Sequence, residues 1–270
     1  MANRRDASRG QVRGAVSADT LRGLVAAANG ILLDLDGTLV HSEYASQRAL
    51  QRYFAHRGWT VPASVVESFV GRRAPEVFAT TPGPWRDEDP HLLTVEVQQL
   101  AARIAAPVTP VPGAHQLLTA CTAQGLPYTI VTSATRSWTL QALQLLHAEP
   151  PAEGMVTAED YDRGKPEPEP FIRGAELLHA EPRHLIAIED SPAGITSARR
   201  AGVGTVIGVS TTKTASELLA RGADTTVSNL FPLARAVTAR VFTANAHRSR
   251  PDPTDRTGDP VPTLPDSTEV

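Results

Sequence analysis

The 270-residue chain has only one cysteine, Cys121, so no disulfide framework can form within it. We expect a cytoplasmic location, because thiols stay reduced in that compartment. Cys121 lies in a run that is typical of a helix, and we interpret it as core packing and not as a nucleophile. Lysine is also scarce: Lys165 and Lys213 are the only two, although arginine is common.

Strong charge and long apolar runs are missing as well. The net charge of −3 is too small to indicate a nucleic-acid partner or an anionic membrane surface. No apolar run approaches the roughly 20 residues that a membrane-spanning helix needs. Arginines occur near the start, but no apolar segment follows them closely, so we expect no secretory signal. Neither nucleic acid nor membrane is therefore expected as a partner.

Apolar residues make up 41% of the chain, which fits a globular protein of one or two domains. Short apolar runs alternate with helix-like segments, and this alternation predicts an α/β fold with a doubly wound, Rossmann-like parallel sheet. Strands are predicted at 30–34, 127–131, 155–156, 184–188, 203–209 and 225–228.

Residues 44–107 interrupt this alternation, because they carry helical patterns only. A crossover between parallel strands does not need so long a connection. We therefore predict an inserted helical cap at 44–107, within a core formed by residues 17–43 and 108–245. The ends are polar, and we predict a disordered arm at 1–16 and a disordered tail at 246–270.

Two carboxylates follow the first predicted strand directly. Asp34 ends the apolar run, Asp36 comes one residue later, and the chain turns at Gly37. On an extended strand the two acids would point to the same side, and like charges so close need a cation or a shared proton. Oxygen ligands suit Mg²⁺. An acidic turn would explain a lone pair of such acids equally well, but the Gly and Thr that follow favour the metal site.

This run, residues 34–39, resembles the first motif of the haloacid dehalogenase superfamily, whose phosphohydrolases use an aspartate nucleophile. The resemblance implies that Asp34 attacks phosphorus to form an aspartyl-phosphate. It implies that Asp36 is the general acid and base, and that Mg²⁺ is bound by Asp34 and by the backbone carbonyl of Asp36. Three further motifs should follow in a set order.

The second motif is the end of the strand at 127–131, where Thr132, Ser133 and Ala134 follow the apolar residues. A hydroxyl and the following N–H groups can hold a phosphoryl oxygen. This stretch is similar to the family's second motif, with either Ser133 or Thr132 as the binding hydroxyl; we favour Ser133. Taken alone, such residues are more often turn formers.

Lys165 lies between Gly164 and Pro166, in a proline-rich loop that resembles the third motif. There the lysine neutralises the nucleophile and the phosphate, whereas without this context a surface lysine would be the better interpretation. Glu189 and Asp190 end another apolar strand and resemble the fourth motif, which completes the Mg²⁺ site. Asp190 alone would equally fit a helix N-cap.

Within the superfamily, residues 69–73 and 131–136 look most like the small-sugar and polyol phosphatases. The resemblance implies a small phosphorylated metabolite as substrate, bound in part by Arg72 or Arg73, although solvated surface arginines fit equally well. A β-phosphoglucomutase-like mutase is the alternative, and a non-catalytic phosphosugar-binding protein is a weaker one. Asp36 argues against a dehalogenase. The sequence leaves open whether the chain is a monomer or a homodimer.

Overall fold

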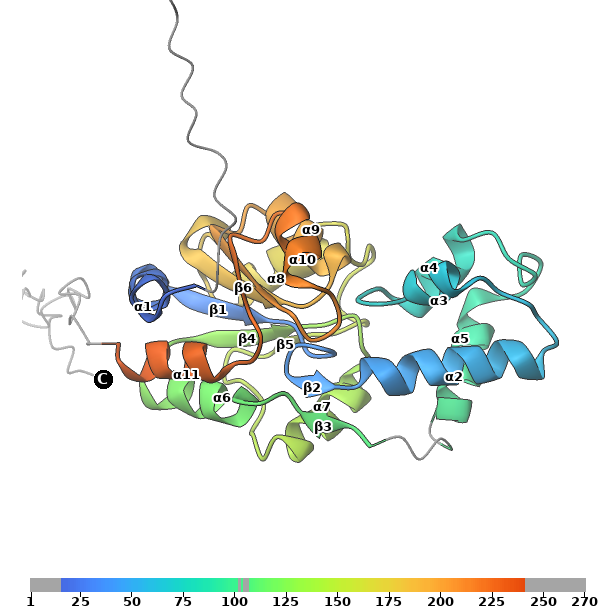
Figure 1. Ribbon diagram of the computed structural model, residues 1–270, viewed down its shortest axis with the longest axis horizontal. Helices are drawn as coiled ribbons and strands as arrows, with labels where there is room; N and C mark the ends of the chain where they lie inside the picture. The colour runs from blue at the N-terminus through green and yellow to red at the C-terminus, as the bar shows by residue number, and fades with distance from the viewer. Residues whose placement is uncertain (1–15, 102, 104–106, 241–270) are drawn as a thin grey trace, which may run out of the picture. The chain divides into compact units, whose positions relative to one another are not determined.

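The computed structural model describes residues 16–101, 103 and 107–240. Its centre is a six-stranded parallel sheet with the strand order β5-β4-β1-β6-β7-β8 (Figure 1). The strands are β1 (Gly30–Leu33), β4 (Tyr128–Val131), β5 (Met155–Val156), β6 (Leu185–Glu189), β7 (Thr205–Val209) and β8 (Thr225–Val227). The predicted α/β fold with a doubly wound parallel sheet is confirmed.

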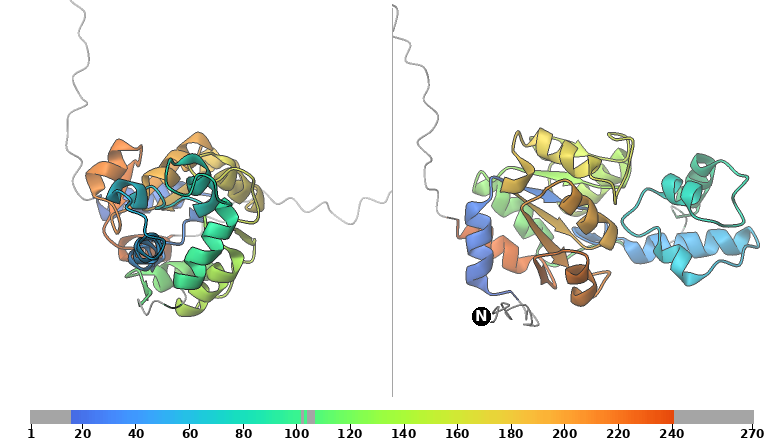
Figure 2. Two further views of the ribbon diagram at one scale, coloured as in Figure 1. Left: turned by 90° about the vertical axis from the view of Figure 1, so that its right-hand side faces the viewer. Right: turned by 90° about the horizontal axis from the view of Figure 1, so that it is seen from above.

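Both faces of the sheet are covered by helices, which explains why β1 is apolar at successive positions. Leu32 packs on the face that carries α8 (Glu169–Leu177), α9 (Pro192–Arg200) and α10 (Ala215–Ala220). Ile31 and Leu33 pack on the opposite face. The helices on that face are α1 (Ala18–Ala27), α6 (Ala114–Ala123), α7 (Arg136–Leu145) and α11 (Phe231–Thr238). Figure 2 shows the two helical layers from further directions.

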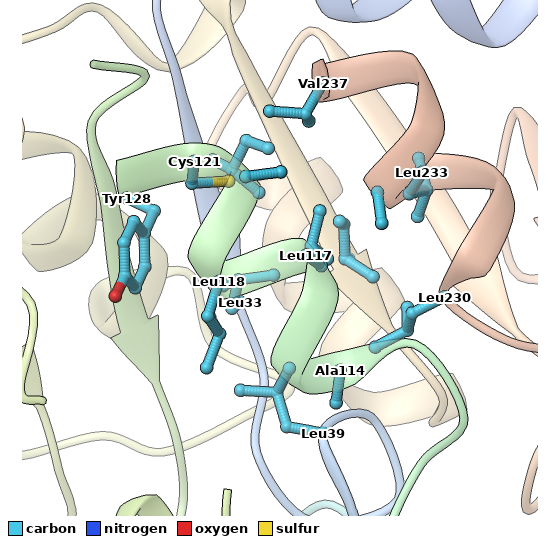
Figure 3. Close-up of a cluster of buried hydrophobic side chains, with 14 of the residues drawn as sticks. Leu33, Leu39, Ala114, Leu117, Leu118, Cys121, Tyr128, Leu230, Leu233 and Val237 are labelled. Atoms are coloured by element: carbon cyan, nitrogen blue, oxygen red, sulfur yellow. The ribbon is translucent and has the colours of Figure 1, made fainter. Parts of the chain in front are cut away.

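The larger core cluster lies between the sheet, α6 and α11 (Figure 3). Leu117 and Leu233 meet there, and Cys121 is fully buried among them, as expected for a packing residue. Burial raises the pKa of the Cys121 thiol to about 12, so the reactive thiolate is rare at neutral pH. This agrees with the interpretation of Cys121 as a structural residue.

A helical segment lies between two short strands, β2 (Val40–His41) and β3 (Thr109–Pro110). Its helices are α2 (Glu43–His56), α3 (Ala63–Glu67), α4 (Ala74–Thr80) and α5 (Pro90–Ala101). These helices bury an apolar cluster of their own, which is rich in aromatic rings. Phe54 stacks on Trp85 with ring centroids 5.3 Å apart, and Phe69 meets Phe78 edge-on at 4.9 Å. The segment is helical, as predicted; its status as a separate cap domain stays a prediction.

Several elements were not predicted from the sequence. Strands β2 (Val40–His41) and β3 (Thr109–Pro110) pair in an antiparallel ladder where the chain leaves and re-enters the α/β part. Strands of two residues are too short to show a period. Helix α11 was also not predicted, although its buried residues Leu233, Ala234, Ala236 and Val237 have helical spacing.

The predicted disordered arm at 1–16 and tail at 246–270 fall almost entirely outside the described residues, which include neither 1–15 nor 241–270. Residues 102 and 104–106, near the end of the predicted helical cap, also lie outside the described residues. In the part of the chain that is described, no helix is both long and apolar enough to span a membrane. A 3₁₀ turn, Pro182–His184, precedes β6 and was also not predicted.

Candidate active site

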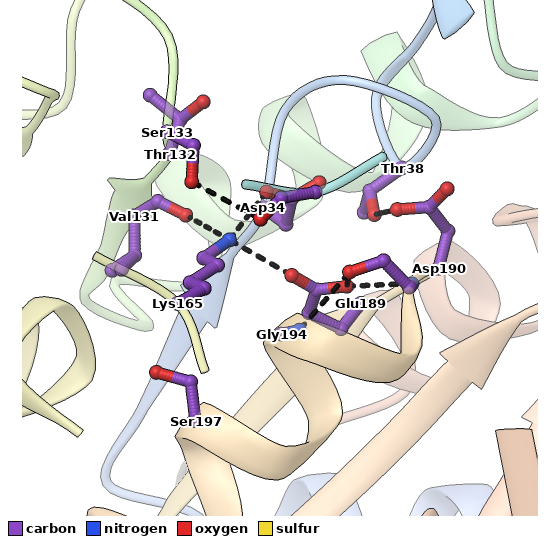
Figure 4. Close-up of polar contacts among 12 residues, drawn as sticks. Asp34, Thr38, Val131, Thr132, Ser133, Lys165, Glu189, Asp190, Gly194 and Ser197 are labelled. Atoms are coloured by element: carbon purple, nitrogen blue, oxygen red, sulfur yellow. Dashed lines mark hydrogen bonds and ion pairs between the residues drawn. The ribbon is translucent and has the colours of Figure 1, made fainter. Parts of the chain in front are cut away.

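The carboxyl ends of three neighbouring strands bring polar side chains together. Asp34 follows β1, Thr132 follows β4, and Glu189 and Asp190 end β6, which pairs with β1 on its other side. Ligands bind at this edge of open α/β sheets, where the chain winds away in two directions. Lys165 reaches the same point from the loop before α8 (Figure 4). The structure thus gathers residues from all four sequence motifs.

Lys165 is fully buried, and its ammonium group donates three hydrogen bonds. The acceptors are Asp34 Oδ1 at 2.6 Å, Glu189 Oε1 at 2.8 Å and the carbonyl oxygen of Val131 at 2.9 Å. Burial opposes the charge, but the attraction of Asp34 and Glu189 more than offsets it and raises the pKa of Lys165. Lys165 is therefore a fixed positive charge and is not the surface lysine of the alternative interpretation.

Asp34, Glu189 and Asp190 form a buried acidic cluster, in which one oxygen of each lies within 4.8 Å of the others. Of the residues that the structure describes, only Lys165 forms an ion pair with them. Burial, together with the neighbouring Glu189, raises the pKa of Asp34 to about 7 even though Lys165 opposes the shift. Burial, Glu189 and Asp34 likewise raise the pKa of Asp190. Negative charge in excess of its partners, presented by oxygen atoms only, fits a hard divalent cation.

The three acids differ in how much of their hydrogen-bonding capacity is already used. Glu189 accepts from Lys165 with Oε1, and its Oε2 accepts from the backbone N–H of Ser191 at 2.7 Å and from the hydroxyl of Ser191 at 2.9 Å. Asp190 accepts from the hydroxyls of Thr212 and Thr38. Both oxygens of Glu189 therefore accept from a cation or an N–H group, whereas the side chain of Asp190 accepts, among the described residues, only from neutral hydroxyls.

Gly37 lets the turn after Asp36 approach Asp190 closely. Its φ of +85° lies in the region that favours glycine. A Cβ atom at this position would also collide with the carboxylate of Asp190. The glycine therefore allows the first and the fourth motif to share one site.

Asp36 lies beside the acidic cluster but has different partners. Its Oδ1 accepts from the hydroxyl of Ser42 at 2.5 Å and from the indole N–H of Trp138 at 2.9 Å. Burial raises the pKa of Asp36, and these two hydrogen bonds only partly oppose the shift. Its carboxylate is not one of the three in the acidic cluster. A raised pKa suits a group that must carry a proton.

The second motif divides its hydroxyl groups between two directions. Thr132 is buried, and its Oγ1 accepts from the backbone N–H of Ala134 at 3.0 Å. Ser133 is half-buried and donates to the carbonyl oxygen of Gly71 at 3.1 Å. Thr132 is therefore engaged inside its own turn, whereas Ser133 faces the loop after α3. The choice of Ser133 as the phosphate-binding hydroxyl stays a prediction.

Arg72 and Arg73 also differ in how many hydrogen bonds they make. Arg73 Nη1 donates to the carbonyl oxygens of Tyr161 at 3.2 Å and Asp162 at 3.1 Å, and to Glu76 Oε1 at 3.0 Å. Arg73 thus binds the loop that leads to Lys165. The buried Nε atoms of both arginines have no hydrogen-bond partner among the described residues, but the guanidinium group of Arg72 donates to none of them at all. Of the two, Arg72 keeps more of its capacity for a ligand.

Several residues near the site were not singled out from the sequence. Trp138 and Ser42 bind Asp36, and Glu76 accepts from the backbone N–H of Gly164 at 2.8 Å. Burial, followed by the repulsion of Asp36, raises the pKa of Glu43 to about 8. Trp138 and Asp36 are 102 positions apart, and no sequence pattern connects them.

The structure thus combines a parallel α/β sheet with a lysine-bridged acidic cluster at its carboxyl edge. Comparison with known proteins gives the family. The sequence profile of the haloacid dehalogenase-like hydrolases matches residues 31–209. This chain belongs to the haloacid dehalogenase-like hydrolase family, as its four motifs predicted.

Curated relatives of this chain include phosphatases, and also a β-phosphoglucomutase of Mycobacterium tuberculosis that is 31% identical over 45% of this chain and 48% of that protein. It is 38% identical to validoxylamine A 7'-phosphate phosphatase of Streptomyces hygroscopicus subsp. limoneus, over 69% of this chain and 88% of that protein. It is 34% identical to hexitol phosphatase A of Escherichia coli, over 64% of this chain and 79% of that protein. A hydrolase structure from Pseudomonas syringae shares the fold, with a TM-score of 0.69 and 24% identity over 76% of this chain and 94% of that one.

Proposed function

We propose that the protein is a Mg²⁺-dependent phosphomonoester hydrolase that acts on a small sugar or polyol phosphate through an aspartyl-phosphate on Asp34. The observation that carries this proposal is the buried contact of Lys165 with both Asp34 and Glu189, at 2.6 and 2.8 Å. A fixed ammonium beside a buried carboxylate provides both a nucleophile and a charge that attracts a phosphate.

In the first half-reaction, a carboxylate oxygen of Asp34 attacks phosphorus and the bond to the leaving oxygen breaks. Lys165 stays bonded to Asp34 and neutralises charge that gathers on the phosphoryl oxygens. The hydroxyl of Ser133 and the N–H groups that follow it bind a second phosphoryl oxygen. Asp36 in its protonated form donates its proton to the leaving oxygen, so the product leaves as an alcohol.

In the second half-reaction, Asp36 is the base. It accepts a proton from water while the water oxygen attacks the phosphorus of the aspartyl-phosphate. The bond between phosphorus and Asp34 breaks, inorganic phosphate is released, and Asp36 is protonated again for the next cycle. The raised pKa of Asp36 supports this double role.

Asp34, Asp190 and the backbone carbonyl of Asp36 would hold the Mg²⁺ ion, with Glu189 beside them. Bound Mg²⁺ would neutralise the charge of the phosphoryl oxygens and help to orient the phosphate. The excess of buried carboxylates over cations supports a divalent ion at this place. Asp36 contributes its main chain in this scheme, because its side chain is bound to Ser42 and Trp138.

The relatives support the proposed substrate class. One is named as a phosphatase of validoxylamine A 7'-phosphate and the other as a hexitol phosphatase. A hexitol is a polyol, so the second name fits the proposed substrate class directly. Arg72 is the residue that we propose for contact with the substrate, because its guanidinium group donates no hydrogen bond to the described residues, whereas that of Arg73 is bound to Glu76 and to the loop before Lys165.

A panel of phosphorylated sugars and polyols, assayed for phosphate release with and without Mg²⁺, tests the proposal. We expect Mg²⁺-dependent release from one class of polyol or sugar phosphates. Absence of release from every ester, including a dinitrophenyl ester, would contradict a phosphatase.

A phosphosugar mutase is the second candidate, because a mutase needs a second phosphate site and Arg72 is free to provide part of one. Offering β-glucose 1-phosphate separates the two functions. A mutase converts it to the isomeric phosphosugar, whereas the hydrolase releases inorganic phosphate. A cytoplasmic location and a monomeric or homodimeric state are further parts of the proposal.

A further inference from the structure

The described residues donate hydrogen bonds to only one carboxylate oxygen of Asp36. Both of its donors, Ser42 and Trp138, are directed at Oδ1, at 2.5 and 2.9 Å. None of the described residues donates a hydrogen bond to Oδ2. A carboxylate oxygen can accept two hydrogen bonds, so this arrangement uses Oδ1 fully and leaves Oδ2 for a reacting group.

The two donors are not equivalent. A serine hydroxyl can donate or accept, so Ser42 alone would tolerate a proton on either oxygen of Asp36. An indole N–H can only donate. A proton on Oδ1 would therefore face the N–H of Trp138 without an acceptor, and the proton of a neutral Asp36 belongs on Oδ2.

Trp138 is itself held in place by its helix and by the core. It lies in the first turn of α7, where its backbone N–H donates to the side chain of the N-cap residue Thr135. Its ring packs against the larger core cluster. The direction of its N–H group is thus set by packing that does not depend on Asp36.

We infer that Trp138 is a positioning residue that fixes the carboxyl group of Asp36, so that Oδ2 carries the proton given to the leaving oxygen. This inference rests on the proposed function and adds a residue to it. In the step concerned, the phosphorus–oxygen bond of the ester breaks, the bond from Asp34 to phosphorus forms, and the proton moves from Asp36 Oδ2 to the departing alkoxide. In this scheme Trp138 acts through Asp36 and is not itself a catalytic residue.

The test uses the dependence of kcat/KM on the leaving group. The alkoxide of a polyol is a poor leaving group and needs a proton from the enzyme, whereas dinitrophenolate is stable enough to leave without one. The variant Trp138→Phe keeps an aromatic ring and removes the N–H. We compare its kcat/KM for a hexitol phosphate, or for the alkyl phosphate that the unaltered protein hydrolyses best, with its kcat/KM for dinitrophenyl phosphate.

We expect kcat/KM of Trp138→Phe to fall about tenfold for the alkyl ester and by less than about twofold for the dinitrophenyl ester, because only the first needs a correctly placed acid. Ser42→Ala should change the ratio of the two values less than Trp138→Phe, since Trp138 still directs the proton. Trp59→Phe, the same chemical change within the helical segment, is the matched control and should leave the ratio unchanged.

The ratio does not depend on the fraction of folded enzyme, because both esters report on the same active molecules. An equal loss for both esters would assign Trp138 a purely structural role and overturn the inference, as would an unchanged kcat/KM for both. Failure of the proposed function looks different: the unaltered protein would then hydrolyse neither ester.

Discussion

The α/β edge and the helical segment bury opposite kinds of side chain. At the sheet edge, Asp34, Lys165, Glu189 and Asp190 are almost completely buried, although each carries or can carry a charge. Between α2 and α5 the buried cluster is apolar, with Phe54 and Trp85 stacked at its centre. Buried charges cost stability unless they are paired, whereas buried rings contribute to it.

This contrast separates function from stability. The sheet edge keeps three carboxylates near one ammonium group, an arrangement that folding alone does not favour. The helical segment has no such concentration of buried charge in its cluster. Substitutions at the edge should therefore change turnover first, and substitutions in the ring cluster should change the free energy of unfolding first.

The largest expected effect belongs to Asp34→Asn. Because Asn is not a nucleophile toward phosphorus, kcat should fall by about a thousandfold or more. Phosphate release at saturating substrate measures this, and urea unfolding measures the stability of the same preparation. Near-normal turnover of a folded Asp34→Asn protein would remove the assigned nucleophile.

The two lysines provide a matched pair. Lys165→Met leaves Asp34 and Glu189 buried without their cation, which should destabilise the fold by about 3–5 kcal/mol and abolish most turnover. Lys213→Met breaks a partly exposed contact with Glu67 at 3.4 Å and should cost less than about 1 kcal/mol. Urea midpoints of both variants test this. Equal destabilisation would contradict the distinction between the two lysines.

Asp190→Asn should weaken metal binding. In the unaltered protein, Mg²⁺ at about 100 times its dissociation constant should add about 2.7 kcal/mol to the free energy of unfolding. We expect most of this gain to disappear in Asp190→Asn, because a carboxylate ligand becomes a neutral amide. Thermal unfolding with and without Mg²⁺ gives the answer. A metal-induced gain that is the same in both proteins would exclude Asp190 as a ligand.

Phe54→Ala should have the smallest effect on chemistry and a clear effect on stability. Loss of this buried ring should cost about 3–5 kcal/mol, while hydrolysis of dinitrophenyl phosphate by the folded protein should be largely retained.

Cys121 reports on the unfolding of the α/β part, because its thiol is fully buried there. If the helical segment is a domain of its own, the fluorescence of Trp59 and Trp85, measured in the Trp138→Phe background so that it reports on this segment alone, will change at a lower urea concentration than that at which Cys121 becomes reactive. Coincident transitions would instead make the described chain one cooperative unit.

The sequence was sufficient for the parts of the site that follow strands. An apolar run that ends in Asp34 or in Glu189 and Asp190 signals a buried strand and its carboxyl end, and parallel order brings such ends together. The predicted strand at 30–34 corresponds to β1 at Gly30–Leu33. Lys165 was singled out because it lies in a stiff, proline-rich loop that resembles the third motif of the family.

The remaining features depend on packing that has no local pattern. Trp138 reaches Asp36 because α7 lies beside the turn after β1, and Arg73 reaches the carbonyl oxygens of Tyr161 and Asp162 from another part of the chain. A side chain's direction across such distances is set by the tertiary structure. For the same reason the sequence did not distinguish Arg72 from Arg73, or Ser133 from Thr132.

Direct capture of the covalent intermediate tests the central claim. The enzyme is quenched in acid during turnover of its best substrate and treated with borohydride, which reduces an acyl phosphate to an alcohol. Peptide mass spectrometry then locates the modified residue. The account predicts homoserine at position 34, at a level that depends on added Mg²⁺ and is absent from Asp34→Asn. Reduction at another carboxylate, or no reduction although phosphate is released rapidly, would contradict it.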